Sequence, residues 1–108
     1  MTSYDARTQY ERHALERDQL DADPVLQLDR WIADAAAAAV HEPHAMVLAT
    51  VGVDGRPHAR VVLCRGADAD GLRFYSNYES AKGRELAARP WASALFFWPA
   101  LERQVRVE

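Results

Sequence analysis

The period of the apolar positions along the chain changes near residue 45. Before it, residues 23–40 carry apolar side chains at helical spacing, with Asp23 placed to cap a helix and Pro24 suited to its first turn. The apolar stripe comprises Leu28, Trp31, Ile32, Ala35 and Ala39. Because Pro43 disfavours helical torsions at the residue before it, this helix is expected to stop before residue 41, with its stripe in the core.

After residue 45 the apolar positions alternate with a period of two, which is typical of strands. Two such runs flank Asp54 and Gly55, a strong turn signal, so residues 45–65 are predicted to form a β-hairpin. A third strand is predicted at residues 72–77 and a short helix at residues 79–88.

The last part of the chain contains two further predicted strands. Residues 91–99 are almost wholly apolar, which predicts a strand covered on both faces, whereas residues 101–108 alternate and predict one wet face. Glu108 falls in mid-alternation with no turn residue after it, so we expect a truncated chain with an exposed edge. The pattern predicts an α+β fold, an antiparallel barrel with flanking helices that is truncated before closure.

The length of 108 residues is that of about one domain. Residues 1–22 have few apolar side chains and are predicted to form a flexible N-terminal arm. Residues 23–108 are predicted to be the N-terminal part of one barrel domain.

Composition narrows the classes of partner. A net charge of −3 argues against nucleic acid or an anionic membrane, so any anion site must be local, and no apolar run is long enough to cross a bilayer. Cys64 is the single cysteine, which forbids an intrachain disulfide and is simplest in a reducing cytoplasm. The four histidines lack metal-ligand spacing, so no metal is expected.

The stretch "SAKG" places Ser80 and Lys82 at the predicted start of the short helix. A hydroxyl, a cation and unpaired backbone N–H groups suit a phosphate. Serine is equally an ordinary N-cap, and the lysine can simply be solvated. From these residues alone, both interpretations stay open.

Polar residues also recur on the strands: Arg60 and Arg65 on the second, Tyr75 at the end of the third and Gln104 on the fifth. Arg60 and Arg65 differ in parity, so a regular strand places them on opposite faces. Both can serve one site only if the strand twists, bulges or lies at an edge.

Seven segments carry a resemblance to a known family. They are "RTQY", "DADP", "DRW", "EPHAMVLATV", "GRPHARVVLCR", "FYSNYESAKG" and "LERQV". In this order and spacing the chain resembles the N-terminal half of the pyridoxamine 5'-phosphate oxidase family, whose members are FMN-dependent split-barrel enzymes. The resemblance implies an FMN-binding split β-barrel and a homodimer with FMN at its interface. It also implies oxidation of pyridoxamine or pyridoxine 5'-phosphate to pyridoxal 5'-phosphate, with O2 as electron acceptor.

The resemblance also assigns roles to individual residues. For FMN it implies a phosphate contact by Arg60 and Lys82, and further contacts by a set that comprises Val61, Val62, Leu63, Cys64, Tyr75, Ser76 and Gln104. For the substrate it implies Arg7 and Tyr10 in the arm and Arg65 at the end of the strand. No catalytic acid or base is assigned.

Two positions depart from the family pattern. Arg65 stands where many members have lysine, and Ala81 where many carry a second arginine. Two alternatives therefore remain: a related oxidase acting on another ring, such as a phenazine precursor, or a non-catalytic module for FMN binding or dimerisation. We expect the 108-residue chain alone to bind FMN weakly, to associate and to form no aldehyde product.

Overall fold

The structure is a computed structural model that describes residues 15–75 and 81–108, with the backbone alone at residues 81, 82 and 84. The described strands are β1 (Ala45–Val51), β2 (Pro57–Asp68), β3 (Gly71–Phe74), β4 (Ala92–Trp98) and β5 (Arg103–Val107). The described helices are η2 (Arg17–Gln19), α1 (Pro24–Ala37), α2 (Ala81–Ala88) and η3 (Pro99–Leu101).

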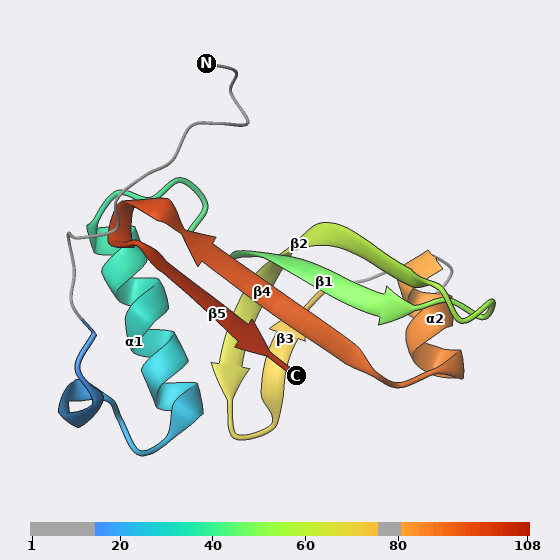
Figure 1. Cartoon of the computed structure of the whole chain (residues 1–108), viewed down its shortest axis with the longest axis horizontal. Helices are drawn as coiled ribbons and strands as arrows, with labels where there is room; N and C mark the ends of the chain where they lie inside the picture. Colours follow the sequence, from blue (N-terminus) through green and yellow to red (C-terminus); the bar gives the residue numbers. More distant parts are fainter. Residues whose placement is uncertain (1–14, 76–80) are drawn as a thin grey trace.

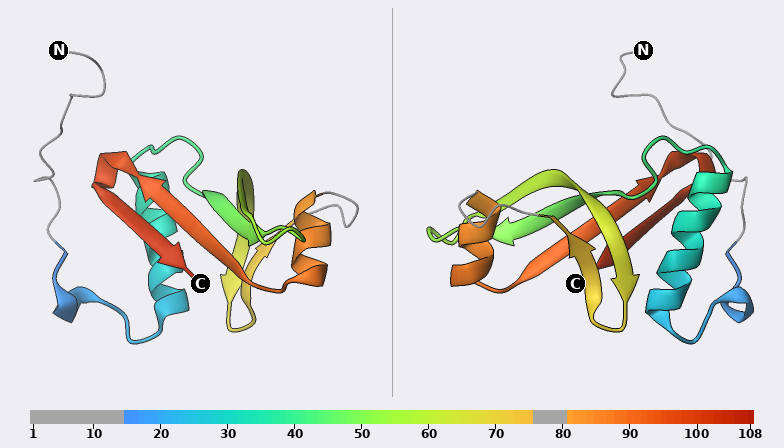
Figure 2. Two further views of the ribbon diagram at one scale, coloured as in Figure 1. Left: turned by 45° about the vertical axis from the view of Figure 1, so that its right-hand side comes forward. Right: turned by 180° about the vertical axis from the view of Figure 1, so that it is seen from behind.

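The strands form one antiparallel sheet in the order β3-β2-β1-β4-β5 (Figure 1). Within the described residues β3 and β5 are its two edges, so the sheet is open. Figure 2 shows that it is strongly twisted, with α1 and α2 at opposite ends. The predicted α+β fold, with antiparallel strands, flanking helices and no closure, is confirmed.

The predicted hairpin is confirmed as β1 and β2. Its turn uses Gly55 at φ 82°, a left-handed torsion that glycine adopts without strain, and the Asp54 side chain accepts a hydrogen bond from the Arg56 amide at 3.0 Å. Strand β2 continues to Asp68, beyond the predicted end. Strand β3 ends at Phe74, earlier than predicted, and residues 76–77 lie outside the described part.

Helix α1 begins as predicted. The Asp23 carboxylate accepts a hydrogen bond from the Val25 amide at 2.9 Å, and Pro24 occupies the first turn. The helix ends at Ala37 because Ala39 adopts a left-handed φ of 58°, which turns the chain and lets the Val40 amide bond to the Ala35 carbonyl at 3.0 Å. The assignment of Ala39 to the apolar stripe was therefore wrong, since it is exposed beyond the helix end.

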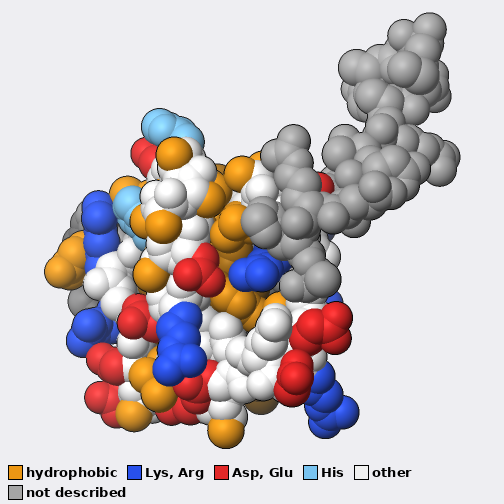
Figure 3. Space-filling model, turned by 90° about the vertical axis from the view of Figure 1, so that its left-hand side faces the viewer, with side chains coloured by type: hydrophobic (Ala, Val, Ile, Leu, Met, Phe, Trp, Pro, Cys, Tyr) orange, Lys and Arg blue, Asp and Glu red, His pale blue; other side chains and the backbone are white. Residues whose placement is uncertain are grey.

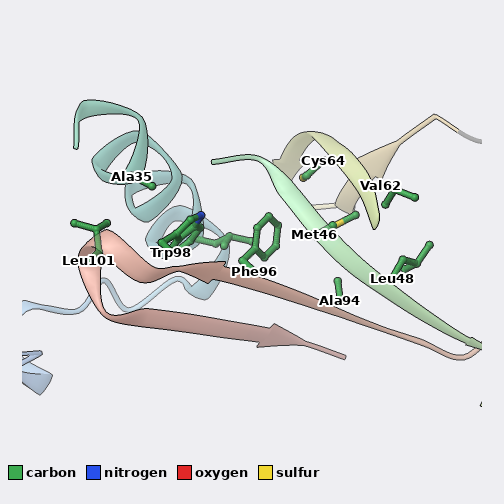
Figure 4. Packing of buried hydrophobic residues seen from close by; sticks show 10 residues of the cluster. Ala35, Met46, Leu48, Val62, Cys64, Ala94, Phe96, Trp98 and Leu101 are labelled. Carbon is green, nitrogen blue, oxygen red and sulfur yellow. The ribbon is translucent and has the colours of Figure 1, made fainter. Parts of the chain in front are cut away.

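The two faces of the sheet differ. The inner face packs against α1 and forms the core shown in Figure 4. Its buried apolar strand residues are Met46, Leu48, Val62, Cys64, Ala94, Phe96 and Trp98, which meet Leu28 and Ala35 of α1. The outer face includes Val47, Val61, Leu63, Leu95 and Phe97. Val61 is 65% exposed and Phe97 54% exposed, so apolar surface remains open there.

Strands β4 and β5 test the two predictions about coverage. Residues 91–99 were expected to be covered on both faces, which is wrong for the described chain: Phe96 is fully buried while Phe97 is exposed. The physical reason is that α1 lies on one face of the sheet only. On β5, Val105 is half-buried and Gln104 is exposed, so the predicted wet face is confirmed.

The surface carries charges of both signs. Figure 3 shows acidic and basic side chains interspersed on the side of the molecule that it faces. Across residues 15–75 and 81–108, no helix has the length and apolarity needed to span a membrane. Nor does that part of the chain contain a group of three His, Cys, Asp or Glu side chains that could hold a metal ion.

Candidate functional site

Arg60 lies on β2, on the inner face, at the end of the sheet covered by α2. Its side chain is 24% exposed. The Nη1 group donates to the Leu48 carbonyl at 3.0 Å and to the Thr50 hydroxyl at 2.7 Å. The Nη2 group donates to the Glu85 carboxylate at 3.3 Å. The guanidinium is therefore held in place by β1 and α2 together.

Glu85, on α2, is the buried anion opposite Arg60. Its side chain is 8% exposed, and it accepts hydrogen bonds from the Thr50 hydroxyl and from Arg60, with His58 Nδ1 at 3.7 Å. The Thr50 hydrogen bond, followed by the Arg60 hydrogen bond and the charges of His58 and Arg60, lowers the pKa of Glu85 below its ordinary 4.5, although burial opposes this. Glu85 is thus a carboxylate at neutral pH. We call Thr50, His58, Arg60 and Glu85 the Arg60 cluster.

The hairpin register explains why the cluster assembles. Leu48 pairs with Arg60 and Thr50 pairs with His58, so these side chains share the inner face. Helix α2 packs against β1 and brings Glu85 over them. Lys82 lies on α2 one turn before Glu85. The two residues predicted to contact the FMN phosphate, Arg60 on β2 and Lys82 on α2, therefore lie on elements that the Arg60 cluster holds together.

The strand residues predicted to line FMN divide between the two faces. Val62 and Cys64 are buried in the core, and the Cys64 thiol contacts the Gly66 carbonyl at 3.4 Å. Val61 and Leu63 face the other way. A flavin along β2 can therefore meet side chains of only one pair, and the backbone of the other.

The residues predicted near the end of β2 are exposed. Arg65 lies where the pairing of β2 with β3 shifts between Cys64 and Gly66. Such an irregularity is what Arg60 and Arg65 would need to serve one site, because a regular strand would place them on opposite faces. Tyr75 follows β3 and is 85% exposed.

Three predicted residues, Arg7, Tyr10 and Ser76, lie outside the described residues. The side chain of Lys82 does so as well, although its backbone is part of α2.

Gln104 is not brought near Arg60. It is exposed on the outer face, opposite Phe97 of β4, and two strands separate β5 from β2. A single chain therefore does not gather all the predicted FMN residues around one point.

An apolar hollow of about 500 Å³ lies elsewhere, between α1, the start of β3 and β5. Its lining includes Leu28, Trp31 and Val105, but none of the residues predicted to bind FMN or substrate. Because none of these residues lines the hollow, the Arg60 cluster is the better candidate site.

Sequence reasoning missed Thr50 and Glu85. The signal for Thr50 was available: it has the parity of Met46 and Leu48, so it had to be a polar group on a buried face. Glu85 carries no comparable local signal, since its partners lie 25 and 35 residues away.

A family model described as pyridoxamine 5'-phosphate oxidase matches residues 32–108. Curated proteins named pyridoxine/pyridoxamine 5'-phosphate oxidase match almost the whole chain. The one from Burkholderia multivorans is 53% identical over 107 residues, covering 99% of this chain and 50% of the relative. The one from Ectopseudomonas mendocina is 53% identical over 109 residues, with 99% and 51% covered.

Solved structures agree on the fold. PhzG from Burkholderia lata, in complex with tetrahydrophenazine-1-carboxylic acid, aligns with a TM-score of 0.80 and 38% identity over 87% of this chain and 48% of that one. A pyridoxamine 5'-phosphate oxidase-related, FMN binding protein from Nostoc punctiforme aligns with a TM-score of 0.66 and 28% identity, covering 81% and 45%. The chain spans about half the length of the curated relatives it matches.

Proposed function

The chain belongs to the pyridoxamine 5'-phosphate oxidase family, and from this premise we propose that it binds FMN and serves the oxidation of pyridoxamine or pyridoxine 5'-phosphate to pyridoxal 5'-phosphate. The observation that carries the proposal is the 53% identity, over 99% of the chain, to a protein named for this activity. When bound, FMN supplies a ring that takes a hydride from the substrate and passes electrons to O2. A cytoplasmic location is part of the same proposal.

Arg60 and Lys82 are the proposed holders of the FMN phosphate. A phosphate suits a guanidinium, which offers paired N–H donors, together with an ammonium at the start of a helix. Arg60 fits this role because it is partly exposed and its orientation is fixed. Lys82 fits because it lies in the first turn of α2.

The remaining proposed FMN contacts follow β2 and its surroundings. Val61 and Leu63 offer side chains on the outer face, whereas Val62 and Cys64, being buried, offer backbone groups. Three further FMN contacts are proposed: Tyr75 directly after β3, Gln104 on β5, and Ser76, which lies outside the described residues.

A second copy of the chain is the proposed partner of the outer face. Val61 and Phe97 expose apolar surface there, and Gln104 lies on the same face opposite Phe97. A homodimer that covered this face would bury the apolar surface and place Gln104 at the interface. This supports the assignment of Gln104 to a site shared between two copies.

Arg65 is the proposed contact for the substrate phosphate, with Arg7 and Tyr10 closing over the substrate. Arg65 is exposed at the irregular point of β2, so its guanidinium is accessible to an anion. The likeness to PhzG favours a second candidate, oxidation of a reduced phenazine ring. The higher identity to the oxidases of the B6 phosphates supports the first.

The test is turnover with FMN present. We would join residues 1–108 to the remaining half of the Burkholderia multivorans relative and assay pyridoxamine 5'-phosphate, pyridoxine 5'-phosphate and tetrahydrophenazine-1-carboxylic acid. Aldehyde formation from the first two supports the proposal. Turnover of the phenazine substrate alone favours the second candidate, and a yellow but inactive protein indicates a binding module.

A further inference from the structure

The Arg60 guanidinium is anchored through its two terminal nitrogens. An arginine has five N–H donors, and both hydrogens of Nη1 have acceptors here, the Leu48 carbonyl and the Thr50 hydroxyl. One hydrogen of Nη2 is directed to Glu85. Apart from the side chains of residues 81, 82 and 84, which the structure does not describe, no described group accepts a hydrogen bond from the Nε–H of Arg60. The edge formed by Nε and the second Nη2 hydrogen is therefore left for a ligand.

The two charged groups fix the direction of the Thr50 hydrogen bonds, because a guanidinium only donates and a carboxylate only accepts. The single O–H of Thr50 donates to Glu85, and its oxygen accepts from Arg60. Glu85 in turn accepts from both, which closes a ring of three side chains. Thr50 is 2% exposed, so water does not compete for these bonds.

Glu85 also connects two elements. It lies on α2, while Thr50 and Arg60 lie on β1 and β2. Because Lys82 is one turn earlier on the same helix, a shift of Glu85 relative to the hairpin would move the lysine relative to Arg60.

We propose that Thr50 and Glu85 are positioning residues that hold Arg60 by its terminal nitrogens and present its Nε edge to the phosphate of FMN. This rests on the proposed function, since it takes Arg60 as a phosphate contact. The arrangement selects a side-on, paired contact between guanidinium and phosphate. It also holds α2, which carries Lys82, in a fixed position relative to that contact.

Charge alone gives the opposite expectation. The Glu85 carboxylate repels a phosphate bound at Arg60, so removing its charge would strengthen FMN binding if Coulomb attraction decided the affinity. If position decides it, removing Glu85 weakens FMN binding. The sign of the change therefore separates the two accounts.

The experiment measures the affinities of FMN and riboflavin by quenching of flavin fluorescence, with residues 1–108 joined to the remaining half of the Burkholderia multivorans relative, because the 108-residue chain alone is expected to bind FMN weakly. Riboflavin lacks the phosphate, so it reports changes that are not specific to the phosphate site. In Glu85→Ala we expect FMN affinity to fall about tenfold and riboflavin affinity to change less than about twofold. Thr50→Val should act in the same direction, about fivefold, and the conservative Thr50→Ser should restore the affinity.

Coupling to Arg60 completes the test. In an Arg60→Ala background, the loss of FMN affinity caused by Glu85→Ala should be clearly smaller than in the wild-type background, because the guanidinium that Glu85 positions is gone. Tighter FMN binding by Glu85→Ala, equal losses for FMN and riboflavin, or an undiminished loss in the Arg60→Ala background would each overturn the proposal.

Two further outcomes separate this proposal from the one on which it rests. If Arg60→Ala itself leaves FMN affinity unchanged, the phosphate assignment fails and this proposal fails with it. If Arg60→Ala weakens binding while both Thr50→Val and Glu85→Ala do not, only the positioning role fails. Circular dichroism accompanies each variant, and should Glu85→Ala not fold, the Thr50→Val and Thr50→Ser pair decides.

Discussion

The two ends of the inner face obey the same alternation but have opposite chemistry. Under α1 the strands present Phe96 and Trp98, two buried side chains whose ring centroids lie 5.7 Å apart. Under α2 the same parity presents Thr50 and Arg60, closed by Glu85. The same face of a strand thus lines the hydrophobic core at one end and the candidate site at the other. The side chains that face α1 are apolar and form the core, whereas those that face α2 are polar and form the site.

The largest effect is expected from damage to the α1 end. Phe96→Ala removes a fully buried ring and should destabilise the fold by about 3 to 5 kcal/mol, measured by urea unfolding. Its neighbour Phe97, on the outer face, provides the matched control. At low protein concentration, where the outer face is not covered by a second copy, Phe97→Ala should reduce the free energy of unfolding clearly less than Phe96→Ala does. Equal losses would mean that the two faces are not distinguished as described.

The next effect concerns the α2 end and leaves the core alone. Arg60→Ala and Lys82→Ala should each weaken FMN binding by about 1.5 to 3 kcal/mol, or roughly ten- to a hundredfold, because each removes a charge-assisted contact. Arg30→Ala is the control, since Arg30 is an exposed arginine of α1 paired with Asp21 at 3.3 Å. Titration of FMN decides, and unchanged affinity in both site variants would contradict the assignment.

A smaller effect is expected from acid. The Thr50 hydrogen bond, with help from Arg60 and His58, holds the pKa of Glu85 below 4.5 in the folded chain. The resulting stabilisation is complete above about pH 4.5 and is lost as the pH falls through the lowered value. Glu85→Gln should flatten this part of the stability profile between neutral and acid pH. An identical acid slope in wild type and variant would show that Glu85 does not contribute.

The smallest effect tests the backbone at the α1 end. Ala39→Gly relieves a left-handed torsion but loosens the unfolded chain, so we expect a net gain of about 0.5 kcal/mol in thermal or urea unfolding. FMN affinity should not change, because Ala39 lies at the end of the sheet away from Arg60. A change in affinity would mean that the two ends are coupled.

Much of the fold could be predicted from local pattern. Asp23, Pro24 and the Asp54-Gly55 turn act through their own neighbours, so helix α1 and the hairpin were predicted with nearly the right ends. Phe97 was misjudged because a wholly apolar run does not reveal which of its two faces a helix will cover. The left-handed Ala39 was missed because alanine gives no signal for that torsion.

The site was predictable only in part. Arg60 and Lys82 came from a family resemblance, and the separation of Gln104 from Arg60 was not foreseen, because it depends on strand order as well as parity. Glu85 could not be inferred at all: its hydrogen bonds span 25 and 35 residues, and a pattern read along the chain does not contain contacts of that range.

A crystal structure of the chain with FMN would test the central claim most directly. The account predicts the phosphate at the α2 end of the inner face, bound by the Nε and Nη2 groups of Arg60 and close to the first turn of α2, with Thr50 and Glu85 still bonded to the guanidinium. A phosphate bound elsewhere, for example on the outer face beside Gln104, with Arg60 making no contact to it, would contradict the account.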